Sequence, residues 1–95
     1  MNNQTAANAL ESLGNEKRLT LYRHLVRAGP AGLPVGQLKD RLKVPGSTLS
    51  HHIAHLVNAG LVSQIREGRV LRCTANFDTM QQLVDYLVEE CCEDA

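Results

Sequence analysis

Two groups of side chains in this sequence could do chemistry. The first is the adjacent thiol pair Cys91-Cys92 near the end of the chain. Two thiolates at one helix end can chelate a soft, thiophilic centre such as trivalent arsenic or antimony. The second is a run of hydroxyl, imidazole and amide groups between residues 47 and 58, which contains no acidic side chain. Such groups can read base edges and phosphates in a DNA major groove by hydrogen bonds.

A helical pattern positions these polar groups. Four apolar residues recur at helical spacing and predict one buried stripe, formed by Leu49, Ile53, Leu56 and Val57. Gly60 then ends the helix. His51 and His55 are four residues apart and could instead hold a metal, but contacts with bases and phosphates explain this face better. We expect the face to read the groove through Ser47, Thr48, Ser50, His51 and His55.

Two further elements flank this helix. Residues 35–42 form a short helix, and a turn at residues 44–46 follows it, so residues 35–59 are predicted to be a helix-turn-helix. After Gly60 the apolar period changes from 3.6 to 2, which predicts a two-stranded wing over residues 61–75 with a turn at Glu67-Gly68. An ordinary charged hairpin is the alternative interpretation of the wing. The side chains expected to contact the DNA backbone are Lys39, Lys43, Arg66 and Arg69.

The distribution of charge agrees with a DNA partner. The chain has 95 residues, enough for one small domain, and a net charge of zero. All ten basic residues lie between residues 14 and 76 with only three acidic ones, whereas residues 77–95 contain six acidic residues. The middle of the chain can therefore face phosphate. No segment has the apolar length of a membrane span or the pattern of a signal peptide, so we expect a cytoplasmic protein without a membrane partner.

The recognition segment resembles that of a known family. Ser47, Ser50-His51-His52, Leu56 and Ala59-Gly60-Leu61-Val62 have the spacing found in the recognition helix of the ArsR/SmtB winged-helix repressors. The resemblance extends from about Leu10 to Cys92. It implies a single, mainly α-helical domain over residues 1–95, with a small β-hairpin wing between the fourth and fifth helices. It also implies a repressor that binds double-stranded operator DNA and leaves it when an inducer binds.

The family's dimer interface uses the first and last helices, which are predicted here over residues 5–13 and 79–92. The last helix carries an apolar stripe that continues to Cys91 and is longer than a domain of this size needs for its own core. A homodimer would place two recognition helices about one DNA turn apart, where they can read an inverted repeat. The expected interface residues are Leu10, Leu13, Met80, Leu83, Val84, Leu87 and Val88.

The resemblance also limits the inducer. The family's Cys-x-Cys arsenic site is missing from the matching residues 33–38, and its zinc-type site needs a histidine that residues 77–95 lack. Cys91-Cys92 resembles the cysteine pair of some arsenic-responsive members, without their third cysteine. Inorganic arsenite would then need Cys73, a partner-chain thiol or water as a further ligand. We expect trivalent arsenic or antimony, inorganic or methylated, as the inducer, with Cys91 and Cys92 as its ligands.

Other interpretations stay open. Cys91 and Cys92 could respond to an oxidant or a persulfide, or Cys91 could serve only for packing at the interface. Cys73 is expected to be a buried structural thiol on the inner side of the wing. A winged-helix domain used only for protein contacts would show no salt-dependent DNA affinity, and the basic middle segment argues against it. Nothing resembles a nucleophile and base pair or a phosphate loop, so we do not expect an enzyme.

Overall fold

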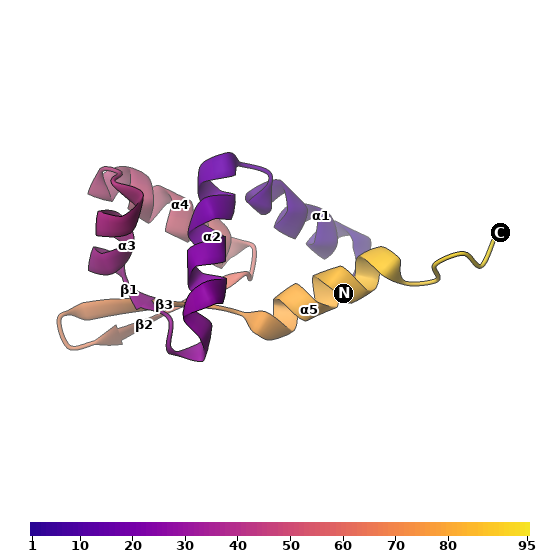
Figure 1. Cartoon of the computed structure of the whole chain (residues 1–95). Helices are drawn as coiled ribbons and strands as arrows, with labels where there is room; N and C mark the ends of the chain where they lie inside the picture. The colour runs from indigo at the N-terminus through magenta and orange to yellow at the C-terminus, as the bar shows by residue number, and fades with distance from the viewer.

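The sequence folds into five α-helices and a small antiparallel sheet, and the computed structural model describes all of residues 1–95 (Figure 1). The helices are α1 (Asn3–Leu13), α2 (Glu16–Ala28), α3 (Val35–Leu42), α4 (Gly46–Asn58) and α5 (Phe77–Val88). A 3-10 turn, η1 (Gly29–Ala31), precedes the strands β1 (Leu33–Pro34), β2 (Val62–Glu67) and β3 (Val70–Ala75). The predicted order of helices and hairpin is confirmed. None of the helices combines the length and the hydropathy that a membrane crossing requires.

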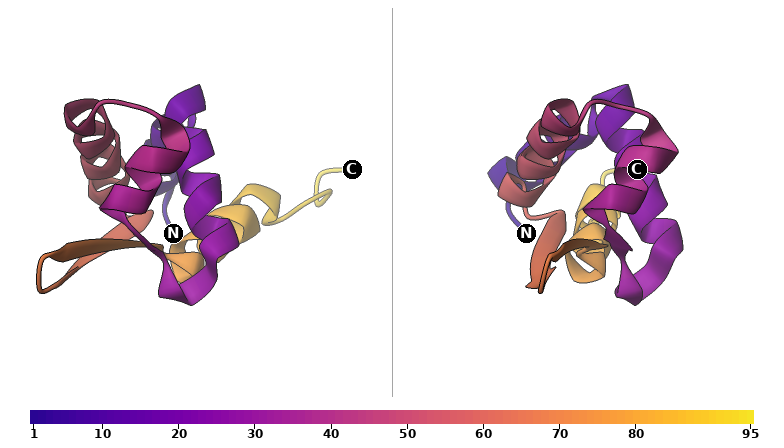
Figure 2. Two further views of the ribbon diagram at one scale, coloured as in Figure 1. Left: turned by 60° about the vertical axis from the view of Figure 1, so that its left-hand side comes forward. Right: turned by 90° about the vertical axis from the view of Figure 1, so that its left-hand side faces the viewer.

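One apolar core joins the helices to the sheet. The predicted stripe of α4 is buried, since Leu49, Ile53 and Leu56 are at most 2% exposed. They belong to the same cluster as Leu21 and Leu25 of α2. Burying a leucine side chain contributes about 1.5–3 kcal/mol, so this stripe fixes which side of α4 faces inward. Figure 2 shows the wing projecting from the helical body that this core holds together.

The helix ends follow local signals in the sequence. Asn15 Oδ1 accepts hydrogen bonds from two backbone N–H groups in the first turn of α2, at 3.0 and 3.1 Å. Gly60 follows α4 with a φ of +78°, and the Leu61 N–H donates to the Leu56 carbonyl at 3.0 Å. Glycine adopts this left-handed φ without a steric penalty. The predicted end of α4 is confirmed, and α2 begins where Asn15 caps it.

The wing is a hairpin whose turn differs by one residue from the prediction. β2 and β3 pair antiparallel as far as Glu67 and Val70, so the two-residue turn is Gly68-Arg69 rather than Glu67-Gly68. Gly68 has a φ of +62°, which the first turn residue of a type II′ hairpin requires. The strand β1, which the sequence did not predict, pairs with the other edge of β3 and gives the order β1-β3-β2. Arg69 therefore lies at the tip of the wing.

The last helix is shorter than predicted. α5 ends at Val88 rather than at residue 92, and Cys91 and Cys92 lie in turns beyond it. Four of residues 89–94 are acidic, and acidic side chains are unfavourable at the negative end of the helix dipole. All of residues 87–95 are exposed, so no packing offsets this effect. In Figure 1 the segment after α5 leaves the body at the end opposite the wing. Cys91 therefore does not continue the apolar stripe of α5.

The predicted dimer residues divide into two groups. Leu83 is 5% exposed and belongs to the core of its own chain, and Leu13 and Met80 pack partly against that core. The interface prediction needs correction for Leu83, because this side of α5 is buried in its own domain, whereas the interface role of the half-buried Leu13 and Met80 stays a prediction. The others form what we call the outer apolar face, made of Leu10, Val84, Leu87 and Val88, which are 43%, 51%, 57% and 60% exposed.

Candidate nucleic-acid interface

The solvent side of α4 carries short polar groups without an acidic side chain. Ser47, Ser50 and His51 are exposed, and Thr48 is half-buried. The ring centroid of His51 lies 6.2 Å from that of His52, with the two rings tilted by 55°. Four of the five predicted groove-reading residues are therefore found together in the first half of α4, where hydroxyl and imidazole groups can meet base edges.

The start of α4 lies beside a lysine. α4 begins at Gly46 after Pro45, and no side chain caps its first turn. A Cβ placed on Gly46 would lie 3.9 Å from Nζ of Lys39, so this ammonium group is close to the free N–H groups at the helix start. Both favour an anion at this point, and a DNA phosphate is such an anion. Lys43 is exposed and ends α3 with a φ of 52°.

The wing adds two arginines to this basic surface. Arg66 and Arg69 are exposed, and neither forms an ion pair within the chain. Arg72 differs, because its Nε donates to Oε1 of Glu67 at 2.8 Å and its Nη1 donates to the Ala31 carbonyl at 3.2 Å. Arg72 thus neutralises the one acidic side chain of the wing and ties the wing to η1. Arg66 and Arg69 are left free to contact phosphate.

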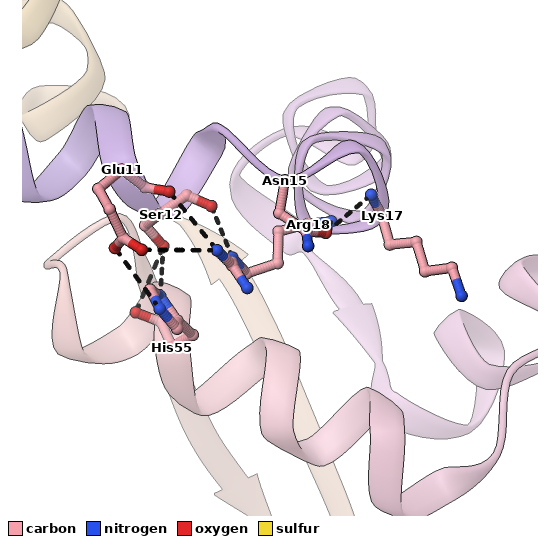
Figure 3. A network of polar contacts seen from close by, with 6 residues as sticks. All are labelled: Glu11, Ser12, Asn15, Lys17, Arg18 and His55. Atoms are coloured by element: carbon pink, nitrogen blue, oxygen red, sulfur yellow. Dashed lines mark hydrogen bonds and ion pairs between the residues drawn. The ribbon is translucent and has the colours of Figure 1, made fainter.

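His55 does not join the solvent side of α4. Its Nδ1 lies 3.0 Å from Oγ of Ser12, and its Nε2 lies 3.5 Å from a carboxylate oxygen of Glu11 (Figure 3). Arg18 donates from Nε to the Ser12 carbonyl at 2.7 Å and lies 3.9 Å from the Glu11 carboxylate. The prediction that His55 reads the groove therefore needs correction, because α1 packs beside the last turns of α4 and its side chains hold this imidazole.

Ser12 and Arg18 of this network were not predicted from the sequence. Ser12 is fully buried. A signal for it was present, since Ser12 follows Ala6 and Ala9 at intervals of three and so continues the buried stripe of α1. A polar side chain on a buried stripe must find a hydrogen-bond partner inside the protein. Nothing in the sequence indicated that this partner would be His55.

His52 is half-buried, and its Nδ1 is buried without a hydrogen-bond partner. Burial lowers the pKa of His52, and nearby positive charges lower it further. In order of effect the groups are Arg18, His51, Lys17 and His55, of which the two histidines contribute only when they are protonated. The surroundings of His52 are therefore electropositive and disfavour its protonated form.

The thiols lie apart from the basic surface. Cys91 and Cys92 are exposed, and their Sγ atoms are 3.0 Å apart. The hydrogen bond with Cys92 raises the pKa of Cys91, and desolvation raises it further. Cys73 is buried, as predicted, and burial raises its pKa although Gln64 Nε2 donates to its Sγ at 3.6 Å. The structure brings together no group of three or more His, Cys, Asp or Glu side chains that could hold a metal ion.

A helix-turn-helix beside a basic wing, with a hydrogen-bonding face on its second helix, defines a winged helix-turn-helix DNA-binding protein. Residues 13–65 match a family described as a helix-turn-helix domain. The transcriptional activator HlyU of Vibrio cholerae is 29% identical over 92 residues, which span 97% of this chain and 82% of HlyU. The chain belongs to the ArsR/SmtB family of winged-helix transcriptional regulators.

Solved structures agree with this assignment. Reduced HlyU from Vibrio cholerae is 30% identical and matches with a TM-score of 0.68, over 94% of this chain and 90% of HlyU. An ArsR-like regulator from Rhodococcus has the same fold, with a TM-score of 0.82 and 24% identity over 95% of this chain and 82% of the regulator. The repressor BigR from Xylella fastidiosa is 28% identical and matches with a TM-score of 0.70, over 90% of this chain and 85% of BigR. This chain is accordingly a DNA-binding transcriptional regulator.

Proposed function

We propose that this regulator is a homodimeric repressor that binds an inverted-repeat operator and releases it when a thiophilic inducer binds Cys91 and Cys92. The observation that carries the proposal is the exposed surface of the polar start of α4, the Lys39 ammonium beside it and the free arginines of the wing. This surface matches the two kinds of contact that operator recognition needs, namely hydrogen bonds to bases and cations on phosphates.

The contacts with DNA divide between groove and backbone. Exposed hydroxyl and imidazole groups on α4 would read base edges, and the first helix of the helix-turn-helix would lie across the backbone. The groove contacts are assigned to Ser47, Thr48, Ser50 and His51. The phosphate contacts are assigned to Lys39, Lys43, Arg66 and Arg69. His55 is assigned to the link between α1 and α4 instead.

The outer apolar face supports the dimer. Its four residues lie on α1 and α5, and Tyr86 Oη donates to Oδ1 of Asn3 at 3.2 Å between the same two helices. Exposed valine and leucine side chains on adjoining helices are stabilised when a partner removes them from water. A second copy of this chain offers the same apolar surface around a two-fold axis, and a two-fold dimer matches an inverted repeat.

The exposed pair Cys91 and Cys92 supports a thiophilic inducer, because two sulfurs 3.0 Å apart can bind one soft centre. Cys73 does not complete this site, since it is buried in the sheet. The chain therefore offers two thiolates at this place. Two thiolates suit a trivalent arsenical that carries one organic group, whereas inorganic arsenite or antimony would need a further ligand from a partner chain or solvent.

The position of the pair supports one route by which an inducer bound there would act. The segment after α5 leaves the body at the end opposite the wing (Figure 1), so a bound inducer would not touch the DNA. Cys91 follows Val88 of the outer apolar face by three residues. An inducer there would change the contact between the two copies and thus the distance between the two recognition helices. The coupling free energy would arise in the dimer interface.

An oxidant or a persulfide is the alternative effector. The short distance between Cys91 Sγ and Cys92 Sγ favours this second candidate, because it brings two thiols together at an exposed site. A disulfide between adjacent residues closes a strained ring, which makes it easily reduced and suits a reversible switch. The raised pKa of Cys91 lowers its thiolate fraction and slows this reaction, so we place the alternative second.

The test begins with an operator selected from random duplex DNA by the purified protein. Fluorescence anisotropy of that duplex then follows release by phenylarsine oxide, arsenite, antimonyl tartrate, zinc, hydrogen peroxide and polysulfide. Wild type is compared with Cys91→Ser/Cys92→Ser. Glu90→Gln/Glu93→Gln changes the charge of the same segment but keeps both thiols, so it is the matched control.

Release by phenylarsine oxide in the wild type and the control, lost in the cysteine variant, is the expected result. Release by peroxide or polysulfide alone would assign the pair to redox or persulfide sensing. Identical behaviour of all three proteins would contradict any inducer role of Cys91 and Cys92. Failure to select any duplex with salt-dependent affinity would contradict the operator-binding part.

A further inference from the structure

A cavity of about 310 Å³ lies between α2 and the helix-turn-helix, where the end of α3, the turn after it and α4 form its other side. Its most deeply buried lining residues are Leu21 of α2 and Leu49 of α4, both fully buried. Leu42 and Val44, which are half-buried, line it from the end of α3 and the following turn. This volume is at the lower end of the range for ligand pockets, so the cavity suits a small molecule with an apolar body.

The polar lining of the cavity favours a negative group. It consists of Glu16, Lys17, Thr20 and His52. Thr20 Oγ1 donates to the Glu16 carbonyl at 3.0 Å, so its hydroxyl proton is already used. His52 Nδ1 is buried without a partner, and the cationic side chains of Arg18 and Lys17 act on His52, although Arg18 also lies 3.9 Å from the Glu11 carboxylate. A ligand with a carboxylate would find an ammonium group and an electropositive field there.

We propose that this cavity binds a small monocarboxylate whose body is one aromatic ring or a short branched hydrocarbon chain. The hydrocarbon part lies against Leu21, Leu42 and Leu49. The carboxylate lies beside the Lys17 ammonium, where the His52 imidazole can donate one hydrogen bond to it. A neutral or cationic ligand of the same shape should bind more weakly, because it leaves the Lys17 ammonium at the edge of the cavity unpaired.

The site also has a route to DNA binding. Leu49 and His52 belong to α4, and Val44 belongs to the turn that sets the angle between α3 and α4, whereas Leu21 belongs to α2. A ligand that bridges these elements stabilises one position of α4 relative to α2. If that position differs from the one that operator DNA selects, the ligand and the DNA weaken each other's binding by the same factor. This coupling rests on the proposed operator binding, but the ligand site itself does not.

The experiment uses 3-phenylpropionate and 4-methylpentanoate as probes, each with its primary amide as the uncharged match. Binding to the whole chain is measured by chemical-shift titration and calorimetry. The ligand concentration is raised to about 10 mM, because a Kd of about 1 mM is expected for such small ligands. Val44→Phe fills the cavity, and Lys17→Gln removes its ammonium group. Arg23→Gln on the same helix is the control, because Arg23 does not line the cavity. Circular dichroism verifies that each variant folds.

We expect the carboxylates to cause saturable chemical-shift changes at Leu49 and His52 of the wild type. The affinity should be about fivefold lower in Lys17→Gln and unchanged in Arg23→Gln. Val44→Phe should not bind the carboxylates. Amides that bind as well as the acids, or carboxylate binding that survives Val44→Phe, would overturn the proposal. So would shifts at these residues caused by duplex DNA but by none of the carboxylates. These measurements need no operator, so their failure is distinguishable from a failure of operator binding.

Discussion

Ser12 Oγ lies 3.0 Å from Nδ1 of His55, although 43 residues separate them in the sequence. Ser12 belongs to α1, which carries part of the outer apolar face, and His55 belongs to α4, which carries the polar recognition side. The side chain of Ser12 is fully buried, so water cannot replace this contact in the folded chain. The hydrogen bond therefore fixes the position of the recognition helix relative to the proposed dimer helix.

Replacing Ser12 by alanine is expected to destabilise the fold by about 1–2 kcal/mol, because His55 Nδ1 then loses its buried partner. Urea unfolding followed by circular dichroism measures this change. Ser50→Ala is the matched control, since Ser50 is exposed on α4 and its replacement should leave the unfolding free energy nearly unchanged. Equal stability of Ser12→Ala and wild type would contradict the importance of the link.

Arg66→Ala and Arg69→Ala should weaken DNA binding at all sequences alike, since both side chains are assigned to phosphates. Each variant is expected to reduce the slope of log K against log salt by about 1.8, because a homodimer loses one phosphate contact, worth about 0.9, from each protomer. Anisotropy titrations at several salt concentrations give the slope. Arg23→Ala removes an equally charged side chain from α2, outside the interface, and an equal effect there would show that net charge alone is responsible.

Leu87→Glu should convert the dimer into monomers, because it places a charge on the outer apolar face. The fold should survive, since Leu87 is 57% exposed within its own chain. Light scattering coupled to size-exclusion chromatography gives the mass of each species. Leu19→Glu on α2 is the control, as Leu19 is also exposed, at 43%. A wild-type protein that is monomeric, or a Leu87→Glu variant that stays dimeric, would refute this interface.

His52 should make the protein less stable in mild acid. Its pKa in the folded chain is lowered from 6.5, mainly by burial, so the unfolded chain binds more protons once the pH falls through that value. The free energy of unfolding should therefore decrease as the pH falls through 6.5, and the decrease should be smaller in His52→Gln. Urea unfolding at a series of pH values measures both slopes, with His51→Gln as an exposed control. Parallel slopes for wild type and His52→Gln would contradict this assignment.

The sequence by itself determined the elements that depend on neighbouring residues. The stripe of Leu49, Ile53 and Leu56 specified the buried side of α4 because a helix repeats every 3.6 residues. Asn15 specified the start of α2, and Gly60 the end of α4, because capping involves only the adjacent turn. The same local signals were sufficient for the winged helix-turn-helix and for Ser47, Ser50 and His51 on its recognition side.

Only the tertiary structure decided how the elements share their surfaces. His55 and His51 look alike on the helical wheel, but α1 packs beside one and leaves the other exposed. Leu83 and Leu87 belong to one stripe, yet Leu83 is buried in its own chain while Leu87 stays exposed. The end of α5 at Val88 likewise reflects missing packing beyond it. These outcomes depend on contacts between residues far apart in the chain, and periodicity within one helix does not contain that information.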